Sequence, residues 1–183
     1  MLIRRLGRGL VAVLFGLIVT SLFGPAASAD TPRHPHLVFV KNMANPLDSR
    51  LYLYYSKPND PQRYYIVMRA GSGVGSTDDC QRNRGFLPDG TYPVRQWNVP
   101  GTPHTTKTTL GGPVWYLGNH LCHGNLNSRT ELFIHSNGVR GTRWNGNYAT
   151  DGCIKISQAD RDRLLARWRI AYDTVHADLL VRS

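Results

Sequence analysis

The stretch HLVFVKNMANPLDSRLYLYYSKPNDPQRYYIVMRA, residues 36–70, decides the fold class of the chain. It holds three runs rich in β-branched and aromatic residues, which predict strands at His36–Lys41, Arg50–Ser56 and Tyr64–Ala70. The residues PNDP at 58–61, between the last two runs, are typical of a tight turn. Short extended segments joined by turns favour a mainly β domain.

The same pattern continues towards the C-terminus. Turn sequences such as PDG at 88–90, and Asn-Gly pairs at 137–138 and 145–146, separate further extended runs. These runs predict additional strands at Thr91–Trp97, Pro113–Leu117, Glu131–His135, Gly152–Ser157 and Ala177–Arg182. Many short strands with frequent turns predict a β-sandwich or barrel-like domain.

One segment near the C-terminus has helical periodicity instead. Ser157 can cap the start of a helix, with Asp160 three residues further on. Apolar residues then recur at helical spacing along one stripe. They are Leu164, Leu165, Trp168, Ala171 and Tyr172. We therefore expect one amphipathic helix that packs on the sheet.

The first 29 residues have the organisation of a secretory signal peptide. Three arginines precede an apolar run at 10–23, and small residues follow up to Ala29. The run is shorter than the roughly 20 residues that a membrane-spanning helix needs, so we expect cleavage after Ala29 and no stable membrane span. Residues 30–36 would form a flexible mature N-terminus, and residues 37–183 a single domain.

The charge balance narrows the class of partner. Three of the 22 Lys and Arg residues lie in the first 29 residues, which leaves 19 against 12 Asp and Glu residues and a net charge of +7. An exported basic protein favours anionic partners such as cell wall polymers. The arginines are scattered and no nucleic-acid-binding motif accompanies them, so no nucleic acid partner is expected. We expect a secreted, periplasmic or cell-wall-associated monomer.

Three cysteines set the redox chemistry. Cys80 and Cys122 lie in polar, Gly-flanked segments, whereas Cys153 enters a β-rich run. Three pairings are possible in an oxidising compartment, and one cysteine is left over. The polar segments favour a Cys80–Cys122 disulfide, worth roughly 4 kcal/mol on a chain-entropy estimate, with Cys153 free. The segment HLCH at 120–123 has no second ligand pair at zinc-like spacing, so we expect neither a metal nor a cofactor.

His135 and Cys153 could form a base and a nucleophile. The strand predicted at Glu131–His135 ends at the histidine, and the Gly-, Asn- and Arg-rich residues after it predict a loop that returns beside that strand. Only a few per cent of an ordinary thiol is ionised near neutral pH, and a neighbouring imidazole can take its proton. Alternation would place Asp151, Cys153 and Lys155 on one face, an unusual set for a core. A structural histidine and cysteine are the alternative.

The residues around this pair resemble the signature of the L,D-transpeptidases. In that family a His followed by Gly or Ser precedes Ser/Thr-His-Gly-Cys; here His135 and Ser136 precede Thr150-Asp151-Gly152-Cys153. The resemblance also includes GFLPDGTYPV at 85–94 and the Trp-bearing segment at 112–115, and it covers roughly residues 37–181. It implies a β-rich catalytic domain that acts on peptidoglycan stem peptides.

The resemblance also implies the roles of residues. Cys153 would attack the carbonyl between the diamino acid and the following D-residue, form a thioester and release D-alanine. An amine of a neighbouring stem would then form a cross-link. His135 would be the base, the carbonyl of Ser136 would orient its imidazole, and the N–H groups of Gly152 and Cys153 would form the oxyanion hole. Thr150 would line the site.

Further residues are candidates for substrate contact. Lys155 could hold a substrate carboxylate; three aromatic residues near the site could contact sugar or peptide or pack in the core, and they are Trp115, Trp144 and Tyr148. Asp151 replaces the family's histidine, and a carboxylate beside a thiolate disfavours its ionisation. Lys155 could neutralise it, or it could bind the free amine of the stem.

Other functions stay open at this stage. Water as the acceptor would make the enzyme an L,D-carboxypeptidase, and a toxin that targets the wall could share the fold. The departure at Asp151 also allows a non-catalytic module that binds the cell wall.

Overall fold

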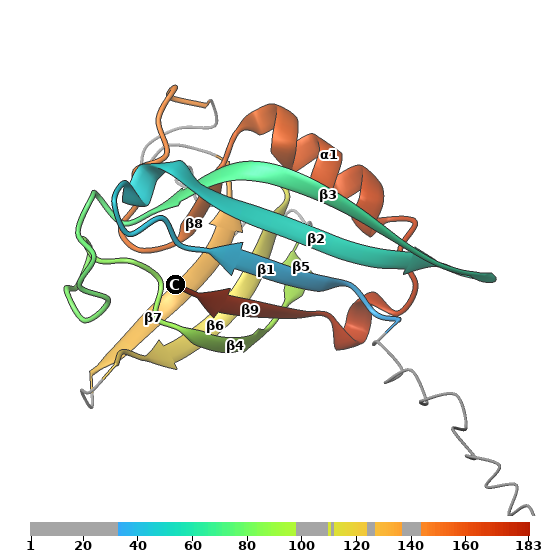
Figure 1. Ribbon diagram of the computed structural model, residues 1–183, viewed down its shortest axis with the longest axis horizontal. Helices are drawn as coiled ribbons and strands as arrows, with labels where there is room; N and C mark the ends of the chain where they lie inside the picture. Colours follow the sequence, from blue (N-terminus) through green and yellow to red (C-terminus); the bar gives the residue numbers. More distant parts are fainter. Residues whose placement is uncertain (1–32, 98–109, 111, 124–126, 137–143) are drawn as a thin grey trace, which may run out of the picture. The chain divides into compact units, whose positions relative to one another are not determined.

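The computed structural model describes residues 33–97, 110, 112–123, 127–136 and 144–183 (Figure 1). The Asn-Gly pair predicted as a turn at 137–138 lies outside the described residues. In the described part, nine strands form one sheet in the order β4-β9-β1-β2-β3-β8-β7-β6-β5. The strands are β1 (His36–Val40), β2 (Ser49–Lys57), β3 (Asp60–Ser72), β4 (Gly90–Pro93), β5 (Arg95–Trp97), β6 (Val114–Leu121), β7 (Ser128–His135), β8 (Ile154–Ile156) and β9 (Asp178–Arg182).

The sheet curls until it is nearly closed, which makes it barrel-like. Strand β4 pairs with β9 at one edge and β5 pairs with β6 at the other, yet only Val94 separates the two strands along the chain. The single strand predicted at Thr91–Trp97 is therefore two, because its two halves pair with different strands. The prediction of a mainly β, barrel-like domain is confirmed.

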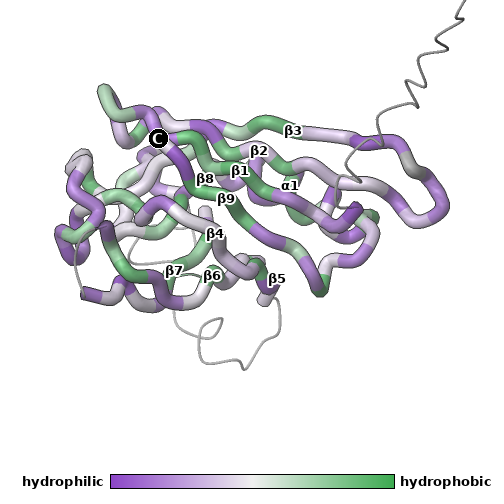
Figure 2. The backbone as a smooth tube through the Cα atoms, turned by 60° about the horizontal axis from the view of Figure 1, so that its bottom comes forward, coloured by the Kyte–Doolittle hydropathy of each residue, from purple (hydrophilic) through white to green (hydrophobic). Residues whose placement is uncertain are grey.

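Alternation along the strands builds the core. In β2, Leu51, Leu53 and Tyr55 are buried, whereas Arg50 is exposed. Figure 2 shows hydrophobic segments along β1, β8 and β9, and hydrophilic residues in the loops around them. Most strands run antiparallel to their neighbours, but β1 pairs with β9 and β7 pairs with β8 in parallel.

The helix α1 (Gln158–Trp168) follows β8 directly. Its N-cap is Ser157, whose Oγ accepts a hydrogen bond from the Asp160 N–H at 3.0 Å, as the sequence predicts. Leu164 and Trp168 are buried, and the indole of Trp168 packs edge-on against Trp115 from β6. Two short 3₁₀ helices, Pro46–Asp48 and Thr174–His176, complete the described elements.

Candidate active site

A tight turn carries Cys153 into β8. The hydroxyl oxygen of Thr150 accepts the N–H of Gly152 at 3.0 Å and the N–H of Gly73 at 3.1 Å, and it donates to the carbonyl of Cys153 at 2.7 Å. Ser72 Oγ donates to the carbonyl of Gly152 at 3.1 Å. The turn is therefore fixed to the end of β3 rather than free to move.

The strand at this position starts later than the sequence predicts. Gly152 has a φ of +115°, outside the range that other residues adopt readily, and β8 begins only at Ile154. Asp151, Gly152 and Cys153 thus form a bend, and the expected alternation of Asp151, Cys153 and Lys155 along one strand is wrong.

The pairing of β7 with β8 defines where His135 and Cys153 lie. Ile134 is level with Ile154 and His135 is level with Lys155 in this parallel pair. Cys153 itself lies in the bend directly before β8, so the strand register does not extend to its side chain. The end of β7, at His135, therefore lies beside the strand into which Cys153 leads.

The sulfur of Cys153 contacts the backbone of β7. Its Sγ donates to the carbonyl of Glu131 at 3.7 Å, and it accepts a backbone hydrogen bond from Phe133. Glu131 has a left-handed backbone conformation with φ of +55°, and its N–H binds Asn119 Oδ1 at 3.1 Å. A non-glycine residue in that region marks local strain, which here aims a carbonyl at the thiol.

An open pocket of about 960 Å³ lies beside this sulfur. Its lining is both polar and apolar and comes mostly from β7, the turn before β8 and the segment around the disulfide. The residues are Cys80, Arg82, Asn83, Leu110, Asn127, Ser128, Arg129, Thr130, Glu131, Leu132, Phe133, Asp151 and Cys153. A volume of this size suits a peptide segment or a small ligand.

The resting thiol is protonated at neutral pH. The pKa of Cys153 is raised to about 11, chiefly because the sulfur is desolvated. The hydrogen bond from Phe133 and the charge of Arg129 lower this pKa, whereas the carboxylates of Asp151 and Glu131 raise it. A nearby base is therefore required if the sulfur is to act as a nucleophile near pH 7.

We expect the alkylation of Cys153 by iodoacetamide to rise steeply with pH. Below its pKa, the thiolate fraction increases about tenfold per pH unit, so the rate should climb by that factor for each unit between pH 7 and about 10. Loss of the thiol, followed by mass spectrometry, measures the rate, and Cys153→Ala provides the blank. A plateau below pH 8 would contradict the assigned environment.

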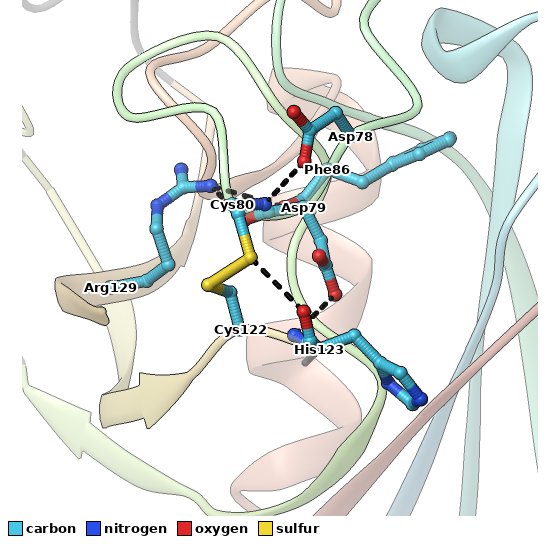
Figure 3. Close-up of a disulfide and its surroundings, with 7 residues drawn as sticks. All are labelled: Asp78, Asp79, Cys80, Phe86, Cys122, His123 and Arg129. Atoms are coloured by element: carbon cyan, nitrogen blue, oxygen red, sulfur yellow. Dashed lines mark hydrogen bonds between the residues drawn. A yellow bond between two sulfur atoms is a disulfide. The ribbon is translucent and has the colours of Figure 1, made fainter. Parts of the chain in front are cut away.

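The structure joins Cys80 and Cys122 and leaves Cys153 reduced, which is the pairing expected from the sequence. The disulfide ties the loop before β4 to the end of β6. Figure 3 shows the guanidinium of Arg129 next to this loop, where its Nη1 donates to the carbonyl of Asp79 at 2.7 Å. The carboxylate of Asp79 lies near the two sulfurs, but both sulfurs are used by the disulfide.

Lys155 does not lie at the pocket, which corrects the expectation that it holds a substrate carboxylate. It is fully buried in β8, and its Nζ donates to Asn145 Oδ1 at 2.7 Å and to Asn147 Oδ1 at 3.3 Å. Burial lowers the pKa of this ammonium to about 8. Because Lys155 is held by the asparagine loop, it is not the partner of Asp151, and its position explains how that loop is anchored.

The predicted aromatic residues lie away from the pocket. Trp115 is fully buried in the core against Trp168, so of its two expected roles, substrate contact and core packing, the structure shows core packing. Trp144 and Tyr148 contact each other edge-on at 5.1 Å, and the Lys155 ammonium lies 5.2 Å from the Trp144 ring. Neither of these two side chains is part of the pocket lining.

The remaining predicted residues divide between the turn and the pocket. Thr150 is buried, so it shapes the turn instead of lining the site. The N–H of Gly152 is already used by Thr150, which leaves the Cys153 N–H as the candidate oxyanion donor. Ser136 is buried directly after β7, and the exposed Asp151 lines the pocket with Cys153.

Arg129 is the residue that the sequence analysis missed. It lies six residues before His135 on β7, is 5% exposed, and reaches both the disulfide loop and the turn before Cys153. No local pattern in the sequence marks Arg129, because its burial results from partners that lie far apart in the chain.

The structure is a mainly β, barrel-like domain with a reduced cysteine at the edge of a pocket. The chain belongs to the YkuD family: the family model, described as L,D-transpeptidase catalytic domain, matches residues 40–176. The resemblance seen in the sequence is thereby confirmed. No curated protein and no solved structure matches the chain significantly.

The helices of the described part are α1 and the two short 3₁₀ helices. Within the described residues, none is both long enough and apolar enough to cross a bilayer.

Proposed function

We propose that the chain is an exported L,D-transpeptidase that cross-links peptidoglycan stem peptides through a thioester on Cys153. The observation that carries the proposal is the parallel pairing of β7, which ends at His135, with β8, into which Cys153 leads from the edge of the pocket. Membership of the YkuD family supports the reaction class.

In the first half-reaction, His135 takes the proton of the Cys153 thiol as the sulfur attacks the carbonyl that precedes the terminal D-residue. The carbonyl oxygen becomes an oxyanion, to which the Cys153 N–H donates. When the tetrahedral intermediate collapses, the C–N bond breaks, and the imidazolium returns its proton to the leaving amine. The carbonyl of Ser136 orients the imidazole in this assignment.

In the second half-reaction, an amine of a neighbouring stem attacks the thioester. His135 accepts the proton of that amine, a new amide bond forms, and the sulfur leaves and is protonated again. The carboxylate of Asp151, exposed at the pocket, is assigned to the ammonium of a stem's diamino acid, because opposite charges attract most strongly where water is partly excluded.

The proposed site of action lies outside the cytoplasm. Residues 1–29 would be removed on export, residues 30–36 would lead into the domain, and the enzyme would act as a monomer in the periplasm or at the cell wall. The Cys80–Cys122 disulfide supports an oxidising compartment, since such bonds are rare in the cytosol.

Incubation of the purified mature chain with muropeptides that carry tetrapeptide stems tests the function. Cross-linked dimers, detected by liquid chromatography and mass spectrometry, are the expected product. Tripeptides without dimers would instead identify a carboxypeptidase, and the absence of both products from folded protein would refute the proposal. Cys153→Ala serves as the control for contaminating hydrolases.

A further inference from the structure

Arg129 is held in place by backbone carbonyls from three separate parts of the chain. Nη1 donates to the carbonyl of Asp79 at 2.7 Å and to that of Phe86 at 3.4 Å, and Nη2 donates to the carbonyl of Asp151 at 3.0 Å. The side chain therefore joins the disulfide loop, the segment before β4 and the turn before Cys153. Three directed bonds fix the orientation of the guanidinium plane.

The same guanidinium lies directly against Gly152. A Cβ atom built on Gly152 would overlap Nη2 of Arg129, so only glycine leaves room for the cation. Gly152 also needs its positive φ to make the bend. Two independent features of the turn thus depend on the position of Arg129: the carbonyl of Asp151 that it binds, and the Gly152 surface that it covers.

Arg129 retains its charge without a direct carboxylate partner. Among the described residues it forms no ion pair within 4.0 Å, and its hydrogen bonds go to neutral carbonyls. A buried charge costs free energy unless an opposite charge or hydrogen bonds offset the lost hydration. An anion formed in the adjoining pocket would supply that opposite charge.

The charges that face the Cys153 sulfur are unbalanced without Arg129. From the described residues, the carboxylate of Asp151 comes from the turn itself and that of Glu131 from β7; both oppose a thiolate. Arg129, also on β7, is the positive group among them. The interaction is reciprocal, because ionised Cys153 raises the pKa of Arg129, which burial lowers.

We propose that Arg129 is the positioning residue of this site, which holds the turn at residues 151–153 and supplies the fixed positive charge that stabilises the Cys153 thiolate. It compensates for the carboxylate that stands where the family has a histidine. The inference deepens the proposed function, and its importance for catalysis rests on that function. The effect of Arg129 on the ionisation of the Cys153 thiol does not depend on it.

Alkylation rates of wild type, Arg129→Gln and Arg129→Lys between pH 7 and 10 test the proposal. Glutamine keeps hydrogen-bond donors but removes the charge, so the thiol should react about tenfold more slowly, or slower still, at each pH; this corresponds to a pKa at least about one unit higher. Lysine keeps the charge, and its rate should lie closer to wild type. Arg84→Gln, an exposed arginine outside the pocket lining, should leave the rates unchanged.

Two results would overturn the proposal. One is a folded Arg129→Gln variant, checked by circular dichroism and thermal melting, whose rates superimpose on those of wild type. The other is equal slowing in the Gln and Lys variants, because the charge would then be irrelevant and Arg129 would only pack.

A measurement on the unsubstituted site covers the case in which these variants do not fold. In isotope-labelled protein, the NMR resonance of Arg129 Nε should move as the pH rises and Cys153 ionises, and it should stay still in Cys153→Ser. A resonance that moves equally in both proteins, or in neither, refutes the electrostatic link. None of these experiments uses peptidoglycan, so failure of the muropeptide assay and failure of this inference are separate outcomes.

Discussion

Cys153→Ser is expected to eliminate the covalent adduct that a carbapenem forms with the wild-type protein. Family membership leads us to expect that the drug acylates the sulfur, which intact-mass spectrometry would detect as one added molecule. Serine keeps the shape of the side chain, but a hydroxyl is a far weaker acid than a thiol and a weaker nucleophile. We expect acylation to slow by at least about 10³-fold.

His135→Ala should also slow acylation by the carbapenem, although the Cys153 sulfur is still present. Because the pKa of the thiol is about 11, the sulfur would remain protonated near pH 7 without a base, and acylation should slow by about 10²–10⁴-fold. Met43→Ser, which removes an exposed sulfur from the surface, is the matched control and should acylate normally. Rapid acylation of a folded Cys153→Ser variant, or an adduct on another residue, would exclude Cys153 as the nucleophile.

Gly152→Ala is expected to inactivate the site by distorting the turn that carries Cys153. The φ of +115° is unfavourable for alanine by about 1–3 kcal/mol, and the new methyl group would overlap the Arg129 guanidinium. Both effects shift the turn that carries Cys153. Since a displacement of about 1 Å can cost 10²-fold in rate, we expect carbapenem acylation to slow by about that factor or more.

Gly75→Ala separates the two causes. Gly75 has a similar φ of +102°, but a Cβ atom there meets nothing within 4 Å. This variant should lose stability in a thermal melt and still acylate at the wild-type rate. If Gly152→Ala is also acylated at the wild-type rate, the close packing of Arg129 on the turn does not affect the reactivity of Cys153.

The sequence predicts the strands well because their signal is local. Buried and exposed residues alternate in β2 as the sequence pattern indicates, and Ser157 caps α1 with its own hydroxyl. The break at Val94 was not predicted, because it depends on which strands β4 and β5 pair with. Pairing across the whole sheet is a tertiary property that a run of apolar residues does not encode by itself.

The same difference between local and tertiary signals decides which parts of the candidate site could be predicted. Cys153 and its free thiol follow from cysteine count and local composition, whereas the destination of Lys155 depends on Asn145 and Asn147 folding over it. Arg129 escaped notice because its partners lie at 79, 86 and 151, far apart in the chain. Strand alternation also fails at Gly152, where a positive φ turns the backbone.

The single oxygen of Thr150 has a consequence for which residues this position tolerates. That atom receives two N–H groups and donates to one carbonyl, so the turn depends on a hydroxyl one bond from Cβ, not on the methyl group beside it. Only serine and threonine offer an oxygen there; valine matches the shape of threonine but would strand two buried donors. The hydrogen bonds made by this one oxygen therefore explain why position 150 requires serine or threonine.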